Sequence, residues 1–173
     1  SLQKVLRDIS QRYSSLIFDE ENEPSLKARL VSLLMTYPMI SSKCIQHSDA
    51  EFDNENCRVD FFMESLDLQV KHRVFECKSI PLLWLDPLQF NVIKRAIAPK
   101  IAEMEIEKLL SLRLNPSIQK REKPCETVGD YIEKCRKQIA EYLDEIEEEK
   151  GERPIGYLVW AVGLVTIHVE QFN

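Results

Sequence analysis

The chain has 173 residues, which is enough for one domain with a sizeable hydrophobic core. Hydrophobic residues make up 44% of it and charged residues 30%, and no apolar run reaches the roughly 18–20 residues of a membrane span, so the composition excludes a disordered or membrane-embedded protein. The formal net charge of −6 argues against a protein that coats nucleic acid with a basic surface, although a local basic groove remains compatible with it.

The five cysteines are scattered along the chain, without a CxxC pair and without histidines at zinc-finger spacing. They are Cys44, Cys57, Cys77, Cys125 and Cys135. An odd, scattered set predicts free thiols, not a disulfide framework or a zinc site. Free thiols are typical of a reducing compartment, so we expect an intracellular protein of the cytoplasm or nucleus.

The first half of the chain changes from helical to strand-like patterning. Apolar residues at helical spacing predict two amphipathic helices within residues 1–40. A polar loop is expected over 41–56. Alternating residues over 57–63 predict a strand, 64–69 a hairpin connection, and 70–80 a second strand.

The second half is mainly helical before it ends in strands. Residues 82–114 are predicted to be a mostly helical insertion, and 115–126 an exposed loop. A long helix follows over 127–150, with Thr127 as its N-cap. Residues 155–172 hold one or two late strands. The whole order predicts a single α/β domain over 1–173, with a central sheet flanked by helices.

The second strand carries two charges on one face. Alternate residues of a strand share a face, so Glu76 and Lys78 point one way while Phe75 and Cys77 point into the opposite layer. A charge on a central strand needs a partner, which is either the neighbouring charge or a metal ion. Asp60 on the preceding strand adds a second carboxylate. Two converging carboxylates form a hard-oxygen site for Mg²⁺ or Mn²⁺.

The spacing of these residues resembles the PD-(D/E)XK nuclease superfamily, with the E-x-K triplet intact at Glu76 and Lys78. Val59 stands where the family has a proline before the aspartate. Within the long helix, Gln138 and Tyr142 form a Q-x-x-x-Y motif, which resembles the branch that contains phage lambda exonuclease and the RecB-type helicase-nucleases. Residues at i and i+4 share one helix face.

The resemblance implies a restriction-endonuclease-like fold, a central mixed β-sheet flanked by helices, and a metal-dependent nuclease acting on nucleic acid, with DNA favoured over RNA. It assigns the Mg²⁺ or Mn²⁺ ligands to Asp60, Glu76, the backbone carbonyl of Cys77, and an assisting Glu23. Lys78 would position or activate water. In the family, the Gln138 and Tyr142 positions face the active site and shape it.

Plainer interpretations stand beside these. Asp60, Glu76 and Lys78 also fit a surface strand pair with an ordinary ion pair, and Tyr142 fits a core position with Gln138 beside it. A nuclease fold that no longer cuts and serves as an interaction module is the main functional alternative. A purely helical adaptor is a third, and it requires 57–80 not to be strands.

Two further features admit a functional and a structural interpretation. Lys120, Arg121 and Lys123 could contact phosphates, and three cations in a solvated loop are equally typical. The apolar residues of 82–114 would cover the sheet, or form a surface for a homodimer or another protein partner.

Overall fold

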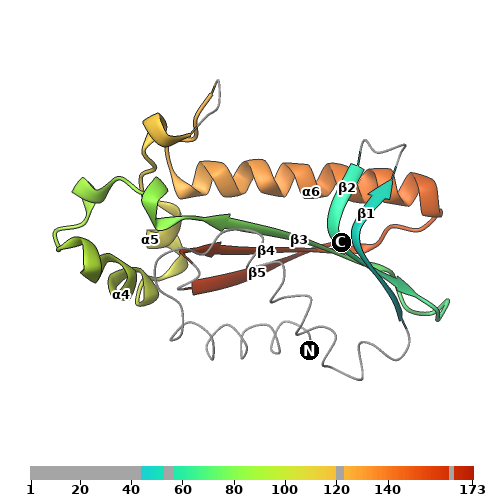
Figure 1. The fold of residues 1–173 in the computed structure, drawn as a ribbon. Coiled ribbons are helices and arrows are strands. Elements are labelled where there is room, and N and C mark those ends of the chain that lie inside the picture. Colours follow the sequence, from blue (N-terminus) through green and yellow to red (C-terminus); the bar gives the residue numbers. More distant parts are fainter. Residues whose placement is uncertain (1–43, 53–56, 120–122, 164–165) are drawn as a thin grey trace.

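The computed structural model describes residues 44–52, 57–119, 123–163 and 166–173 (Figure 1). The two helices predicted within 1–40 lie outside these residues, and so does Glu23. In the described part the chain has a mixed α/β fold built on one five-stranded sheet, in agreement with the predicted α/β class.

The strands follow one another across the sheet in chain order, β1-β2-β3-β4-β5. Neighbours are antiparallel except for β3 and β4, which are parallel and connected through a helical crossover. The strands are β1 (Cys44–Phe52), β2 (Cys57–Ser65), β3 (Arg73–Ile80), β4 (Ile155–Val162) and β5 (Thr166–Phe172). The strand with the predicted charges, β3, is therefore central.

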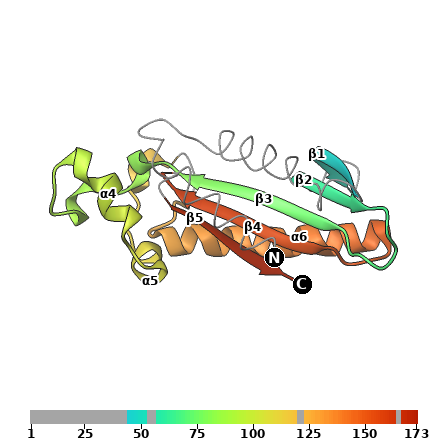
Figure 2. The ribbon, with the colours of Figure 1, turned by 90° about the horizontal axis from the view of Figure 1, so that it is seen from below.

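Between β3 and β4, the described residues form three α-helices and four short 3-10 turns. The helices are α4 (Ile97–Ala102), α5 (Ile106–Leu110) and α6 (Val128–Lys150). The turns are η1 (Leu82–Trp84), η2 (Pro87–Gln89), η3 (Lys94–Ala96) and η4 (Pro116–Ile118). Figures 1 and 2 show α6 running along one face of the sheet, while α4 and α5 gather at the end toward which β3 and β4 run.

The long helix α6 forms where the sequence predicted it, because its buried residues recur at helical spacing. They are Val128, Tyr131, Ile132, Cys135, Ile139, Leu143 and Ile146. Its first turn is closed by a capping box, in which the Thr127 side chain accepts from the Asp130 amide and the Asp130 side chain accepts from the Thr127 amide. Gly151 ends the helix at φ 75°, a left-handed conformation that suits glycine.

The two faces of the sheet bury different residues. On the α6 face, Val74 and Ile80 of β3 pack with residues of that helix. On the other face, Phe75 and Cys77 pack with apolar residues of β2 and β4. The alternation predicted for β3 is therefore confirmed, and Glu76 and Lys78 share the parity of the α6 face.

The expected loop at 41–56 was wrong, because residues 44–52 form β1. The sequence pattern of a strand is weak here, because β1 lies at the edge of the described sheet and is half-exposed along most of its length. It therefore lacks a clean alternation of apolar and polar residues. It pairs with β2 over its length, from Cys44 opposite Ser65 to Phe52 opposite Cys57. The strands at β2 and β3 also exclude the purely helical adaptor.

The predicted helical insertion at 82–114 is only partly helical. The α-helical segments α4 and α5 are short, and the rest consists of 3-10 turns and irregular chain. Pro87 contributes to this, because it cannot donate the backbone hydrogen bond that a helix continuing from η1 would need. Pro99 is tolerated in α4 because it lies in the first turn, at the third position, where its missing amide hydrogen is not needed. The 115–126 loop is not wholly exposed either, because the buried Gln119 side chain bonds the Cys125 backbone at 2.8 and 2.9 Å.

Replacement of Thr127 by alanine should lower the free energy of unfolding by about 1 kcal/mol, because the Asp130 amide at the start of α6 loses its acceptor. Urea denaturation followed by circular dichroism measures this change. Thr127→Ser keeps the hydroxyl and serves as the control. An equal loss in both variants would contradict the capping role.

Candidate active site

Asp60 and Glu76 are joined by a reciprocal pair of hydrogen bonds. The Asp60 amide donates to Glu76 Oε1 at 2.8 Å, and the Cys77 amide donates to Asp60 Oδ2 at 2.8 Å. Each carboxylate thus accepts from the backbone of the opposite strand. The two carboxylates therefore lie together between β2 and β3, on adjacent strands as the sequence predicted.

The position of this pair follows from the way the two strands separate. The regular ladder between β2 and β3 covers only Phe61 opposite Phe75 through Met63 opposite Arg73. Asp60 and Glu76 come next in the same register, where side chains replace the ladder bonds. Beyond this point β2 stays paired with β1, and the β1–β2 hairpin bends away from β3 toward α6 (Figure 1).

Lys78 lies beside Glu76 on the same strand. Its Nζ is 3.9 Å from Glu76 Oε2, and the two side chains are 17% and 5% exposed, respectively. The environment is thus largely buried, and a buried carboxylate needs compensation by hydrogen bonds or positive charge. The plain alternative of a solvated surface ion pair does not describe these residues.

The Q-x-x-x-Y motif reaches the same region from α6. Gln138 Nε2 donates to the Tyr142 hydroxyl oxygen at 2.9 Å. Partial burial raises the pKa of Tyr142, and the charges of Glu76 and Asp60 raise it further, whereas Lys78 lowers it. Tyr142 therefore senses the charges of all three strand residues, and its phenol is held in the protonated form.

Two carboxylates alone do not complete a metal site. Within the described residues, no group of three or more His, Cys, Asp or Glu side chains is arranged to hold a metal ion. The donor set that can be named is the oxygens of Asp60 and Glu76, with the Cys77 carbonyl as the backbone ligand that the resemblance implies. Such hard oxygens suit Mg²⁺ and Mn²⁺, which complete their shells with water.

Other candidate residues do not join this group. Lys123 is exposed in the loop before α6, and Lys120 and Arg121 lie outside the described residues. His72 has a structural role, because its Nδ1 accepts from the Ser65 amide at 2.9 Å and its ring packs on Phe62.

Sequence reasoning missed the anchor on the other flank of α6. Arg136 Nε donates to Glu170 Oε1 at 2.8 Å, and the buried Trp160 donates its indole N–H to Glu170 Oε2 at 2.8 Å. The partners are 34 and 10 residues apart, so no local spacing rule could have found them. The network ties the helix that carries Gln138 to β5.

Neither a family model nor a curated protein nor a solved structure matches the chain significantly. Among the described helices, none combines the length and apolar character needed to cross a membrane. The function must therefore be inferred from the side chains of the site.

The raised pKa of Tyr142 provides a test of this geometry. Tyr142 should ionise above the usual value of about 10, and Glu76→Gln should lower its pKa toward that value without reaching it, because burial remains. NMR of ¹³Cζ-labelled tyrosine measures this, with Tyr142→Phe assigning the resonance.

The exposed Glu148, replaced by glutamine, is the matched control and should leave the pKa of Tyr142 unchanged. If Glu76→Gln also left it unchanged, Tyr142 would not face the carboxylate pair.

Proposed function

We propose that this protein is a metal-dependent nuclease of the PD-(D/E)XK type, which hydrolyses nucleic-acid phosphodiester bonds and prefers DNA. The observation that carries the proposal is the reciprocal hydrogen bonding of Asp60 and Glu76 beside Lys78. It brings two carboxylates and an ammonium group together on a central strand and its neighbour, which is the donor set that phosphodiester hydrolysis with a divalent cation requires.

The arrangement of elements supports the same proposal. The strand with Asp60 is antiparallel to the strand with Glu76 and Lys78, and α6 with Gln138 and Tyr142 crosses over to a parallel β4. A mixed central sheet with this order of motifs is what the restriction-endonuclease-like architecture calls for.

Asp60 and Glu76 would hold the Mg²⁺ or Mn²⁺ ion, together with the Cys77 carbonyl and the assisting Glu23 that the resemblance implies. The bound ion would polarise the phosphodiester and lower the pKa of a coordinated water. The amides of Asp60 and Cys77 fix the two carboxylates before any ligand arrives. Such preorganisation removes part of the cost of arranging the site.

Lys78 would orient the attacking water and stabilise negative charge on the phosphate. Its ammonium group carries three donors, and its side chain is 17% exposed, so it can serve both Glu76 and a ligand at the surface of the site. In a partly buried environment such a charge acts more strongly than it does in water.

Tyr142 and Gln138 would shape the part of the site where the substrate binds. The Tyr142 oxygen accepts from Gln138, which directs the phenolic hydrogen elsewhere. A tyrosine phenol is protonated at neutral pH, and the raised pKa of Tyr142 strengthens this, so it can donate its hydrogen to a phosphate oxygen or a bound water.

One observation favours the rival function, a nuclease fold that serves only as an interaction module. In the segment between β3 and α6, Leu83, Leu88 and Ile93 are 68%, 89% and 59% exposed. Contiguous apolar patches are typical of surfaces that bind a partner or a second copy, and these residues are the large apolar side chains that this segment offers for one. The rival predicts that the carboxylate pair neither binds metal nor supports cleavage.

Cleavage of labelled single- and double-stranded DNA with Mn²⁺ tests the proposal. Asp60→Asn, Glu76→Gln and Lys78→Met should each reduce the rate by about 10²-fold or more, since each removes a group that acts on the reacting atoms. Calorimetry should show Mn²⁺ binding that is lost in Asp60→Asn and retained in Lys78→Met.

The control is again Glu148→Gln, which changes the same charge on the exposed side of α6 and should leave both readouts unaltered. Cleavage by Asp60→Asn or Glu76→Gln at the wild-type rate would refute the assignment. Absence of both Mn²⁺ binding and cleavage in the wild type would favour the interaction module.

A further inference from the structure

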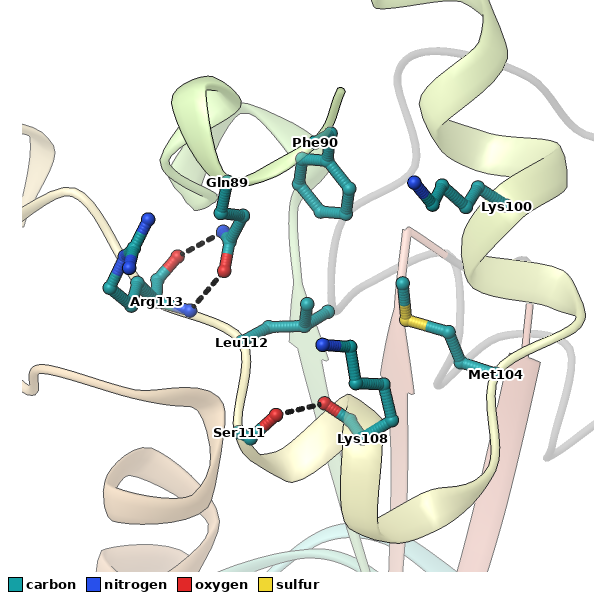
Figure 3. A pocket seen from close by; sticks show the side chains of 8 residues that line it. All are labelled: Gln89, Phe90, Lys100, Met104, Lys108, Ser111, Leu112 and Arg113. Atoms are coloured by element: carbon teal, nitrogen blue, oxygen red, sulfur yellow. Dashed lines mark hydrogen bonds between the residues drawn. The ribbon is translucent and has the colours of Figure 1, made fainter. Parts of the chain in front are cut away.

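A separate cavity of about 240 Å³ lies at the end of the sheet that holds α4 and α5 (Figure 3). It is formed by the segment from η2 to the chain just after α5. The residues that line it are Gln89, Phe90, Lys100, Met104, Lys108, Ser111, Leu112 and Arg113. Three of these eight are cationic and none is acidic, in a chain whose formal net charge is −6.

The two lysines bring positive charge to the cavity. Figure 3 shows the ammonium groups of Lys100 and Lys108 on the inner side of the cavity, near Phe90 and Leu112. Neither group forms an ion pair with any residue in the described part of the chain. Arg113 differs, because its Nε lies 3.7 Å from Asp86 Oδ2 and its charge is partly matched. Two like charges facing one hollow favour occupation by an anion.

The wall of the cavity is fixed by hydrogen bonds. The Gln89 amide accepts from the Arg113 backbone N–H at 2.6 Å and donates to the Arg113 carbonyl at 2.8 Å. The Ser111 hydroxyl donates to the Lys108 carbonyl at 2.6 Å, so its oxygen can still accept. The buried Phe90 and Leu112 form an apolar floor that belongs to the same core as α6. The hollow is thus part of the packed structure.

We propose that this cavity binds a nucleotide phosphate, with the ammonium groups of Lys100 and Lys108 contacting its oxygens. Lysines contact phosphate as point charges, which needs no fork geometry. The volume lies below the roughly 300–1,000 Å³ of sites for drug-sized ligands, and so suits one phosphate with its sugar. The apolar floor gives the sugar a surface to pack on.

The choice of a nucleotide over another phosphoester rests on the proposed function. The cavity lies beyond the end of β3, and the four residue-to-residue steps from Glu76 to Ile80 span about 13 Å along that strand. A nucleic-acid strand held at Asp60 and Glu76 could reach the cavity by following β3. Its phosphate contacts here would position the strand without reading its sequence.

Binding is tested on the whole chain in EDTA, so that it does not depend on the metal site. The probes are a fluorescein-labelled ten-residue oligothymidylate, followed by anisotropy at several salt concentrations, and thymidine 5′-monophosphate, followed by calorimetry. Lys100→Gln/Lys108→Gln should weaken oligonucleotide binding at least tenfold. It should also reduce the slope of log K against log salt concentration by about 1.4, since each lost phosphate contact to a single strand contributes about 0.7.

The control, Lys71→Gln/Lys94→Gln, removes the same charge from two exposed lysines that do not line the cavity, and its affinity and slope should match the wild type. Thermal melts confirm that both double variants fold. In EDTA no metal occupies the carboxylate pair, so Glu76→Gln should bind the oligonucleotide as the wild type does. The binding experiment therefore tests the cavity even if the catalytic proposal fails.

Loss of monophosphate binding in Lys100→Gln/Lys108→Gln would identify a free nucleotide as sufficient. Loss of oligonucleotide binding alone would identify strand phosphates as the ligand. Equal affinity and slope in the two double variants, or no binding of either probe by the wild type, would overturn the proposal.

Discussion

The candidate site depends on one change in hydrogen bonding between β2 and β3. Where the backbone ladder stops, the amides of Asp60 and Cys77 donate to carboxylates instead of to carbonyls. A hydrogen bond to a charged group contributes roughly 1.5–3 kcal/mol, more than a neutral bond, so the strands lose little by giving up regular pairing here. What the exchange creates is a pair of neighbouring carboxylates with fixed orientation, of which Glu76 is buried and Asp60 is partly exposed. Their repulsion must be offset by positive charge, which Lys78 supplies in part and a divalent cation would supply further.

The parts of this site that could be predicted from sequence all follow local rules. Strand parity placed Glu76 and Lys78 together, and the observed packing of Phe75 and Cys77 on the other face bears this out. Helical spacing placed Gln138 beside Tyr142, and their hydrogen bond agrees with it. The contact of Asp60 with Glu76 needed one further assumption, that two consecutive strands pair as neighbours, which they do in most sheets.

The parts that could not be predicted depend on partners distant in the sequence. β1 is a strand because it pairs with β2, and at the side of the sheet it remains half-exposed. Its sequence is therefore polar and resembles that of a loop. One wall of the cavity next to α5 is built by Gln89 and the backbone of Arg113, which bond to each other across 24 residues of sequence. The spatial meeting of Lys100 and Lys108 follows from how the short helices pack. Helical patterning alone overestimated the regularity of this region.

The orientation of α6 depends both on its own sequence pattern and on a contact with a residue distant in the sequence. Its apolar stripe decides which side faces the sheet, whereas rotation about the helix axis is limited by polar contacts on its flanks. Arg136 and Gln138 are two residues apart and therefore point about 200° away from each other around the helix. Arg136 is held by Glu170 of β5, so the opposite flank, with Gln138 and Tyr142, is turned toward the strands that carry Asp60 and Glu76. The edge strand β5, which contributes no residue to the carboxylate pair, thus helps to set how Tyr142 meets it.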